Sequence, residues 1–293
     1  MPSRVIRRRL DARKRRARGA MAILSRISVG LAERWAEALF RTPPRQKPTR
    51  AERRVLDGGK RTLLRAGRRS LWAWRWGNGG PRVLLVHGWG GHAGGLAAFV
   101  APLCDAGYGV VAVEAPAHGE SGGRRASLPY FARAILAADR ELGPFHGLIG
   151  HSMGAAGAAL AIRDGLRVGR AVFLAPPADP EEFSVRFARA LGLPGAVRDG
   201  MKRRLERRYA ARWAEVKLIA CAPETPVPLL IVHDARDREV PLRDAGAILL
   251  AWRGATIVRT RGLGHHKIAR DRSVVEVALG FLSAGEREKA QLA

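Results

Sequence analysis

The stretch Gly150-His151-Ser152-Met153-Gly154 decides the fold of this 293-residue chain. It follows the apolar residues 147–149 and precedes the alanine-rich residues 155–162, an order typical of a short strand, a sharp turn and a helix. Glycines at both ends of the turn would let strand and helix approach closely, because a β-carbon would clash there. The serine would then stand at a helix amino terminus, where free amides and the helix dipole favour developing negative charge. The pattern predicts that Ser152 is a nucleophile.

A carboxylate and a base follow downstream, each after a strand-like segment. Asp237 follows the apolar run 229–232, and His265 follows the run 255–258. A serine hydroxyl is a weak nucleophile until a neutral imidazole accepts its proton, and the imidazole needs a carboxylate that fixes its tautomer. We therefore predict that Ser152, Asp237 and His265 form a catalytic triad.

Two of these positions have a competitor of the same residue type. Asp234 lies three residues before Asp237, but the Val-Pro pair at 240–241 favours Asp237, and aspartates in turns usually bond the local backbone. His266 directly follows His265, and the tight Gly-Leu-Gly loop before this pair favours presentation of the first histidine.

An oxyanion hole needs two backbone amides that point at the same position. Met153 follows the predicted nucleophile and offers the first amide. The second amide is expected from the segment His87-Gly88-Trp89-Gly90-Gly91, which follows the apolar run 82–86. The amide of Trp89 is the best candidate.

Five segments together resemble the α/β-hydrolase superfamily, and look most like its bacterial serine hydrolases. They are HGWGG (87–91), APAHGES (115–121), GHSMGA (150–155), VHDARDREVP (232–241) and GLGHH (262–266). The resemblance covers roughly residues 70–285. It implies Ser152 as nucleophile, His265 as base, Asp237 as acid, and Trp89 and Met153 as oxyanion donors. Glu114 stands where many relatives carry Asp, at a position that the resemblance implies to be structural.

Short apolar strand candidates alternate with helix-like runs between residues 82 and 282. Such alternation predicts an α/β fold, a mainly parallel sheet with helices on both faces. In the resemblance this is the α/β-hydrolase fold. Trp72, Trp74 and Trp76 recur with period two before a glycine-rich turn at 77–80, and predict an antiparallel edge hairpin.

The sequence predicts three parts. Residues 1–70 form a basic N-terminal arm, an amphipathic helix and a linker; residues 71–285 form the hydrolase domain; residues 286–293 form a tail. A segment at about 179–225 interrupts the alternation, where this fold inserts a helical lid. Within it, apolar residues recur at mostly four-residue spacing from Val197 to Val216. This face would cover the site as a lid, or simply pack on the domain.

Positive charge is concentrated near the N-terminus. The first 70 residues hold 22 of the 52 lysines and arginines but only 5 of the 26 acidic residues. Behind the basic run, a stripe of Leu24, Ile27, Leu31, Trp35 and Leu39 predicts an amphipathic helix over residues 20–40. It would dock on the catalytic domain or contact an anionic membrane. Specific nucleic-acid binding is not expected.

No metal motif, phosphate loop or cofactor fingerprint occurs, so we expect no cofactor and no metal. The apolar stretch 19–24 is too short for a membrane span and a poor signal peptide, which predicts a cytoplasmic protein, with peripheral membrane contact as an alternative. The expected activity is cleavage of an ester or thioester of a small acyl substrate through an acyl-enzyme. Peptidase or amidase chemistry with the same triad stays open, as does a binding role led by the basic arm.

Overall fold

The chain divides into two compact units in the computed structural model, which describes residues 4–77, 79–222 and 227–291. The helical unit comprises residues 1–42 and 179–215, and the sheet unit comprises residues 43–178 and 216–293. Residues 43–70, which the sequence grouped with the N-terminal arm, thus belong with the sheet. The inserted part of the helical unit runs from Asp179 to Glu215.

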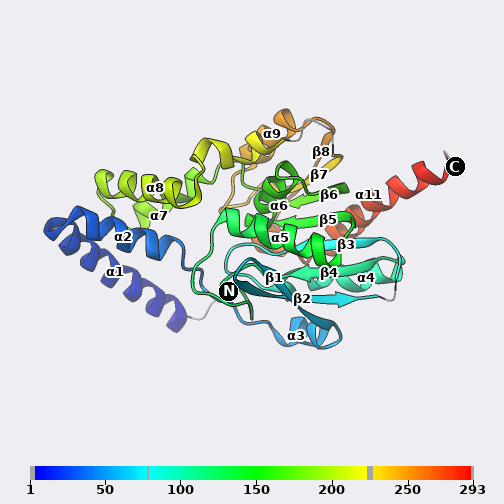
Figure 1. The fold of residues 1–293 in the computed structure, drawn as a ribbon, viewed down its shortest axis with the longest axis horizontal. Helices are drawn as coiled ribbons and strands as arrows, with labels where there is room; N and C mark the ends of the chain where they lie inside the picture. Colours follow the sequence, from blue (N-terminus) through cyan, green and yellow to red (C-terminus); the bar gives the residue numbers. More distant parts are fainter. Residues whose placement is uncertain (1–3, 78, 223–226, 292–293) are drawn as a thin grey trace. The chain divides into compact units, whose positions relative to one another are not determined.

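Eight strands form one sheet in the order β1-β2-β4-β3-β5-β6-β7-β8 (Figure 1). The β1–β2 and β2–β4 pairs are antiparallel, and all pairs among β3 to β8 are parallel, so the predicted mainly parallel sheet is confirmed. The strands are β1 (Lys60–Ala66), β2 (Arg69–Trp76), β3 (Arg82–Val86), β4 (Gly109–Val113), β5 (Phe145–His151), β6 (Val168–Leu174), β7 (Leu229–Asp234) and β8 (Ala255–Thr260).

Helices cover both faces of the sheet, as predicted (Figure 1). One face packs against α5 (Leu128–Leu142), α6 (Met153–Arg163), α9 (Leu242–Ala251) and η3 (Leu218–Cys221). The other packs against α3 (Arg50–Asp57), η1 (Ala93–Phe99), α4 (Val100–Asp105) and α11 (Arg272–Gln291). Burial on both faces explains the continuous apolar runs of the central strands, since every residue of β4 is buried.

The C-terminal residues extend the last helix. Residues 286–293, expected to form a tail, continue α11 as far as Gln291. Residues 292 and 293 lie outside the described part of the chain.

The tryptophan-rich strand β2 has a different hairpin partner from the predicted one. It pairs with β1 through a turn at Gly67-Arg68, where Gly67 has a φ of +59°, whereas the turn at 77–80 leads to a strand that β2 does not contact. β1 escaped prediction because it carries three basic residues and only Leu64 of its seven residues is buried. The hairpin at the sheet edge is therefore β1–β2.

The helical unit contains α1 (Arg4–Ile27), α2 (Val29–Phe40), α7 (Glu181–Leu191) and α8 (Gly195–Tyr209), and η2 (Trp213–Val216) lies at its end. Ser28 splits the predicted single helix over 20–40 in two. Its backbone is extended, with a φ of −159°, and its side-chain oxygen accepts a hydrogen bond from the Leu31 amide at the start of α2. No helix among the described residues is both long and apolar enough to cross a lipid bilayer.

A small core joins α8 to the two N-terminal helices, and consists of Met21, Ala32, Ala36, Val197, Met201 and Leu205. The apolar face of the insertion is therefore buried inside the helical unit. Val197, Met201 and Leu205, which would have covered the site in a lid, pack against α1 and α2 instead. A lid role for the insertion itself stays a prediction.

An ionic contact adds to this core. Glu37 of α2 is 2 % exposed and accepts hydrogen bonds from Arg41 (3.1 Å), Arg204 (3.0 Å) and Arg208 (2.6 Å). Burial raises the pKa of this carboxyl, but the two α8 arginines outweigh burial and lower it below its usual range. Glu37 therefore ties α2 to α8 as a buried anion.

Candidate active site

Ser152 stands on a strained turn between β5 and α6. Its φ is +53° and its ψ is −118°, a conformation that residues with a β-carbon rarely adopt. Neither of the two flanking glycines has room for a β-carbon. A β-carbon at Gly150 would lie 2.7 Å from the Ala155 Cα, and one at Gly154 would lie 2.3 Å from the Val86 carbonyl oxygen. The strand and helix thus approach as closely as the sequence pattern predicts, and the serine projects from the apex.

His265 lies in hydrogen-bond contact with this serine and, through its other ring nitrogen, with Asp237. His265 Nε2 lies 3.0 Å from Ser152 Oγ, and His265 Nδ1 lies 2.7 Å from Asp237 Oδ2. All three side chains are buried. Burial raises the pKa of Asp237, but the hydrogen bond from His265 and the amides of Glu239 and Val240 outweigh burial and lower it. An ionised carboxylate, an imidazole and a hydroxyl therefore form one chain of hydrogen bonds.

The two competing residues occupy other places. Asp234 accepts hydrogen bonds from the Arg236 amide (2.9 Å), the Leu263 amide (2.9 Å) and the Thr260 hydroxyl (2.9 Å). Burial raises the pKa of Asp234, but these donors together bring it down to about 2. Asp234 thus fixes the loop that leads to His265.

His266, the other competitor, directly follows His265 in the chain. Its ring is exposed and its Nε2 lies 2.8 Å from Glu239 Oε1. This carboxylate, as hydrogen-bond partner, raises the pKa of His266. His266 makes no recorded hydrogen bond to Ser152 among the described residues.

The loop after β3 lies next to the serine. A β-carbon at Gly88 would lie 3.2 Å from Ser152 Cβ, so the backbone before Trp89 closely approaches the elbow. Within the described residues, neither the Trp89 amide nor the Met153 amide has a recorded hydrogen-bond acceptor. The Met153 amide directly follows Ser152, and the Trp89 amide directly follows the glycine that approaches the serine; an oxyanion hole requires two such amides that point at one position.

Two buried side chains that were not assigned to the site hold this loop. Glu114 accepts hydrogen bonds from the amides of Ala93 (3.1 Å) and Glu120 (2.6 Å), and burial raises its pKa to about 7. His87 accepts from the Ala115 amide at Nε2, so its Nδ1 carries the proton and donates to the Gly88 carbonyl (2.7 Å). Burial holds the pKa of His87 well below its usual value.

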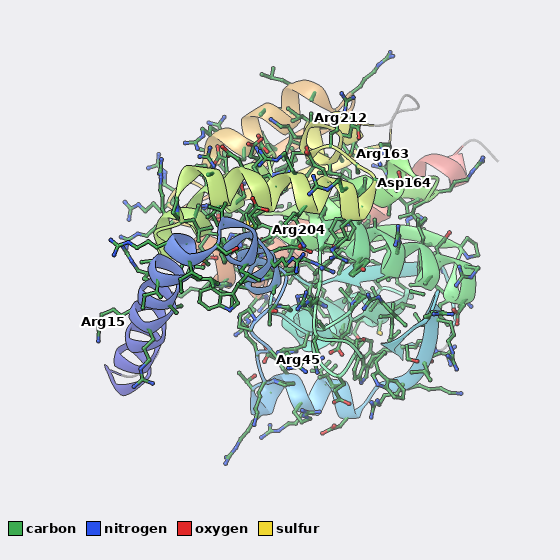
Figure 2. All side chains as sticks on the ribbon, turned by 60° about the vertical axis from the view of Figure 1, so that its left-hand side comes forward. Arg15, Arg45, Arg163, Asp164, Arg204 and Arg212 are labelled. Atoms are coloured by element: carbon green, nitrogen blue, oxygen red, sulfur yellow. The ribbon has the colours of Figure 1, made fainter. Side chains whose placement is uncertain are left out.

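The linker after residue 42 adds a third support. The Gln46 amide donates to the Gly90 carbonyl (3.0 Å). Arg45, labelled in Figure 2, donates to the carbonyls of Ala117, Ser121 and Gly123, all within the turn that follows Glu114. Sequence reasoning missed this role, because a linker arginine carries no pattern that points to carbonyls 72 to 78 residues away.

His151 supports the base directly. Its Nε2 lies 2.8 Å from the carbonyl oxygen of His265, and the two rings lie 4.9 Å apart. Burial lowers the pKa of His151 to about 3, so the ring is neutral and donates to that carbonyl.

The arrangement suits acyl transfer. A neutral imidazole at His265 can take the proton of Ser152, the carboxylate of Asp237 can stabilise the imidazolium, and amides at the elbow can hold an oxyanion. Within the described residues, no group of three or more His, Cys, Asp or Glu side chains is placed to hold a metal ion.

Solved structures with the same fold include hydrolases of several kinds. An esterase of Pyrococcus furiosus, Pf2001, is 20% identical, covers 83% of this chain and 98% of its own, and has a TM-score of 0.64. A membrane phospholipase A, described as a bacterial virulence factor, is 19% identical over 80% of this chain and 88% of its own (TM-score 0.62). Est1E of Butyrivibrio proteoclasticus, solved with ferulic acid bound, is 18% identical, covers 78% of this chain and 99% of its own, and has a TM-score of 0.58.

Sequence comparisons give a family. No curated protein sequence matches the chain. A family model described as the alpha/beta hydrolase family matches residues 83–278, two thirds of the chain, and spans β3 to α11 with the elbow, Asp237 and His265. The chain belongs to the α/β-hydrolase family.

Proposed function

We propose that this protein is a serine hydrolase that cleaves a carboxylic ester or thioester through Ser152, His265 and Asp237. The observation that carries the proposal is the continuous chain of hydrogen bonds, with 3.0 Å from Ser152 to His265 and 2.7 Å from His265 to Asp237. The strained elbow supports the same assignment, since it projects one hydroxyl beside free amides. Esterases, lipases and a phospholipase among the structures of the same fold make an ester the favoured substrate class.

In the proposed reaction, Ser152 Oγ attacks the acyl carbonyl carbon while His265 Nε2 takes its proton. The carbonyl oxygen becomes an oxyanion, which the amides of Trp89 and Met153 stabilise. The carbon–oxygen or carbon–sulfur bond to the leaving group then breaks, and the leaving group takes the proton from His265. Water attacks the acyl-enzyme by the same steps, releases the acid and restores Ser152. Asp237 stays ionised throughout and holds the imidazole in the tautomer that accepts at Nε2.

Labelling with a fluorophosphonate probe tests the nucleophile. We expect wild type to be labelled and Ser152→Ala to remain unlabelled, with turnover of p-nitrophenyl esters reduced at least about a thousandfold. The adjacent histidines provide a matched pair: His265→Ala should lose labelling, and His266→Ala should keep it. Labelling of a folded Ser152→Ala protein would overturn the assignment.

A substrate panel separates ester from amide chemistry. Because esters and amides use the same triad, the comparison should set p-nitrophenyl esters of rising chain length against aminoacyl p-nitroanilides. We expect the esters to be preferred. Preference for the anilides would replace the esterase proposal with a peptidase.

A further inference from the structure

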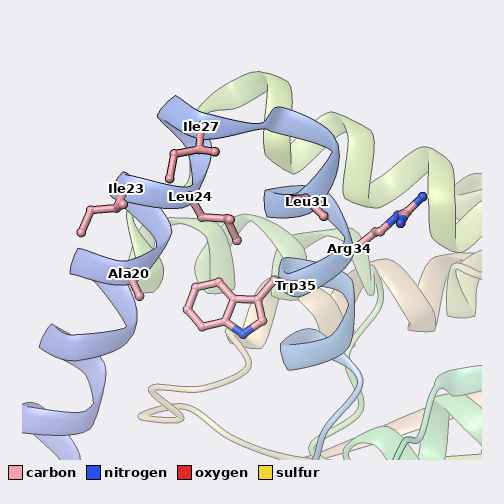
Figure 3. Close-up of a pocket in the computed structure, with 7 residues that line it drawn as sticks. All are labelled: Ala20, Ile23, Leu24, Ile27, Leu31, Arg34 and Trp35. Carbon is pink, nitrogen blue, oxygen red and sulfur yellow. The ribbon is translucent and has the colours of Figure 1, made fainter.

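The helices α1 and α2 enclose an open groove with apolar walls (Figure 3). Its apolar lining consists of Ala20, Ile23, Leu24, Ile27, Leu31 and Trp35. Ile23 is 63% exposed, Ile27 72% and Leu31 48%. Four of the eight large apolar side chains that are most exposed among the described residues lie within positions 23–31. An apolar cluster of this kind marks a surface that binds another apolar phase.

The groove exists because the helical unit packs through small side chains. Ala32 and Ala36 of α2 are fully buried in the core with α8. The larger side chain of Leu31 stays 48% exposed, whereas Trp35 packs in part against this core and its indole lies between the two helices, where it lines the groove (Figure 3). Four of the five residues of the predicted stripe, for which docking and membrane contact were both open, thus line the groove: Leu24, Ile27, Leu31 and Trp35.

Charge is sorted between the two sides of α1 and α2. The carboxylates of α2 face α8, since Glu37 pairs with its arginines and the side chain of Glu33 lies against Gly200. Arg34 lines the groove itself, and Arg26 lies in the last turn of α1, directly before Ile27 in the chain. The groove side therefore combines apolar and cationic groups.

More cations extend along α1. Arg15 and Arg16 are exposed and precede the groove by one turn, and Figure 2 shows the Arg15 side chain standing away from the helix. Neither these two arginines nor Arg26 and Arg34 pair with any described carboxylate. The cations beside the groove are thus free to bind an external anion.

We propose that this α1–α2 surface binds the interface of an anionic phospholipid bilayer, with the isoleucines among the acyl chains and the arginines at the headgroup phosphates. A bilayer interface offers an anionic layer directly above an apolar one, and that order matches this surface. The contact uses none of the residues of the proposed triad and adds membrane attachment to the proposed hydrolase activity.

Two other occupants fit less well. A nucleic acid would neutralise the arginines but leave Ile23 and Ile27 in water. A second copy of the chain would use the same patch on both partners, and would place arginines against arginines. Lipid is the occupant that satisfies both groups.

Flotation of the full-length protein with large unilamellar vesicles tests the proposal. We expect binding to vesicles of phosphatidylcholine and phosphatidylglycerol in equal parts, and at least about tenfold weaker binding to phosphatidylcholine alone. Raising sodium chloride from about 0.1 M to about 0.5 M should weaken binding, because the exposed charges are then screened. Absence of binding to the anionic vesicles would overturn the proposal.

Substitutions distinguish the groove from charge alone. Ile23→Gln with Ile27→Gln keeps helix propensity and should weaken binding to anionic vesicles at least about tenfold. Leu250→Gln is the matched control, since Leu250 is 90% exposed on α9 of the sheet unit, and it should bind within about twofold of wild type. Circular dichroism and fluorophosphonate labelling check that each variant is folded. Unchanged binding by the isoleucine variant would show that charge alone attaches the protein, and would overturn the groove as the site.

Trp35 reports insertion independently. Vesicles that contain brominated acyl chains should quench part of the tryptophan fluorescence, and Trp35→Phe should remove that part. Quenching that persists in Trp35→Phe would place another tryptophan in the lipid and contradict the proposal. Sedimentation without vesicles completes the test: a dimer that the isoleucine variant abolishes, together with no vesicle binding, would assign the groove to a second copy.

Discussion

The sheet unit and the helical unit hold buried carboxylates in different ways. In the sheet unit the donors are mainly backbone amides: Asp234 and Glu114 each accept from two. In the helical unit the donors are arginine side chains, and Glu37 accepts from three of them. An amide is fixed by the fold, whereas an arginine loses side-chain entropy when it is held in one geometry.

This difference matches what each unit has to do. A site that transfers protons needs its groups held in one geometry to within about half an ångström, and amide donors supply that without ordering long side chains. The helical unit needs only to hold helices together around a small core, and guanidinium groups can span between helices. The predictions below test these two kinds of contact and how tightly each unit is built.

The largest effect is expected at the carboxylate of the triad. Asp237→Asn should lower kcat about ten-thousandfold, because an amide cannot hold the required tautomer of His265. Asn can still accept from the amides of Glu239 and Val240, so the turn should persist. Asp234→Asn is the matched comparison. It leaves the Leu263 amide and the Thr260 hydroxyl without an acceptor, and should lower the free energy of unfolding by about 2 kcal/mol.

Ester hydrolysis and urea denaturation measured on both variants separate the two roles. The interpretation fails if Asp234→Asn loses as much activity as Asp237→Asn while its stability stays that of wild type.

The residues of the proposed triad could be chosen from the sequence because each signal is local. The elbow needs only a strand, two glycines and a helix within some fifteen residues. Asp237 and His265 each follow a strand, and the carboxyl ends of parallel strands meet at one edge of the sheet. Whether Asp237 or Asp234, and His265 or His266, faces the serine depends on the direction of the side chains. The sequence indicates that direction only through the spacing of the residues around each candidate.

The helical unit could not be assembled in the same way. Apolar periodicity selected a stripe of large residues for docking or membrane contact, but Leu31 of this stripe is 48% exposed. The fully buried residues of α2 are Ala32 and Ala36, followed by Glu37 at 2% exposure, and Trp35 packs on this core only in part. Small residues allow close approach and a buried carboxylate pairs with distant arginines, and neither has a local signature.

A glycine comparison tests how tightly each unit is built. Gly154→Ala would push a β-carbon to 2.3 Å from the Val86 carbonyl oxygen and 2.5 Å from that of His87, both backbone atoms. We expect a loss of about 3 kcal/mol or more in the free energy of unfolding, with loss of activity. Gly19→Ala, in the middle of α1, meets nothing within 4 Å and should stabilise that helix by about 1 kcal/mol.

Denaturation of the first variant and hydrogen exchange of α1 in the second provide the measurements. A Gly154→Ala protein of wild-type stability and activity would mean that the elbow packs less closely than its backbone distances require.

The smallest of the three effects is expected at Glu37. Glu37→Gln removes the charge that three arginines share, and should lower the free energy of opening of α2 and α8 by about 2 kcal/mol. This expected loss in free energy is smaller than for a fully buried ion pair because Arg208 is 44% exposed. Hydrogen exchange of these helices measures it. Glu276→Gln is the matched control, since it breaks the exposed pair with Arg272 on α11 and should cost no more than about 0.5 kcal/mol.

The pH dependence of the same hydrogen exchange tests the direction of the contribution that ionised Glu37 makes to stability. Because the pKa of Glu37 is lowered in the folded protein, its contribution to stability is complete above the ordinary carboxyl pKa and is lost as the pH falls below it. Wild-type protection of α2 should therefore decline on acidification below about pH 4.5, and Glu37→Gln should show a flatter decline over that range. Equal pH profiles for wild type and Glu37→Gln would mean that the apolar core alone holds α2 and α8 together. The arginine donors would then contribute nothing to the stability of the helical unit.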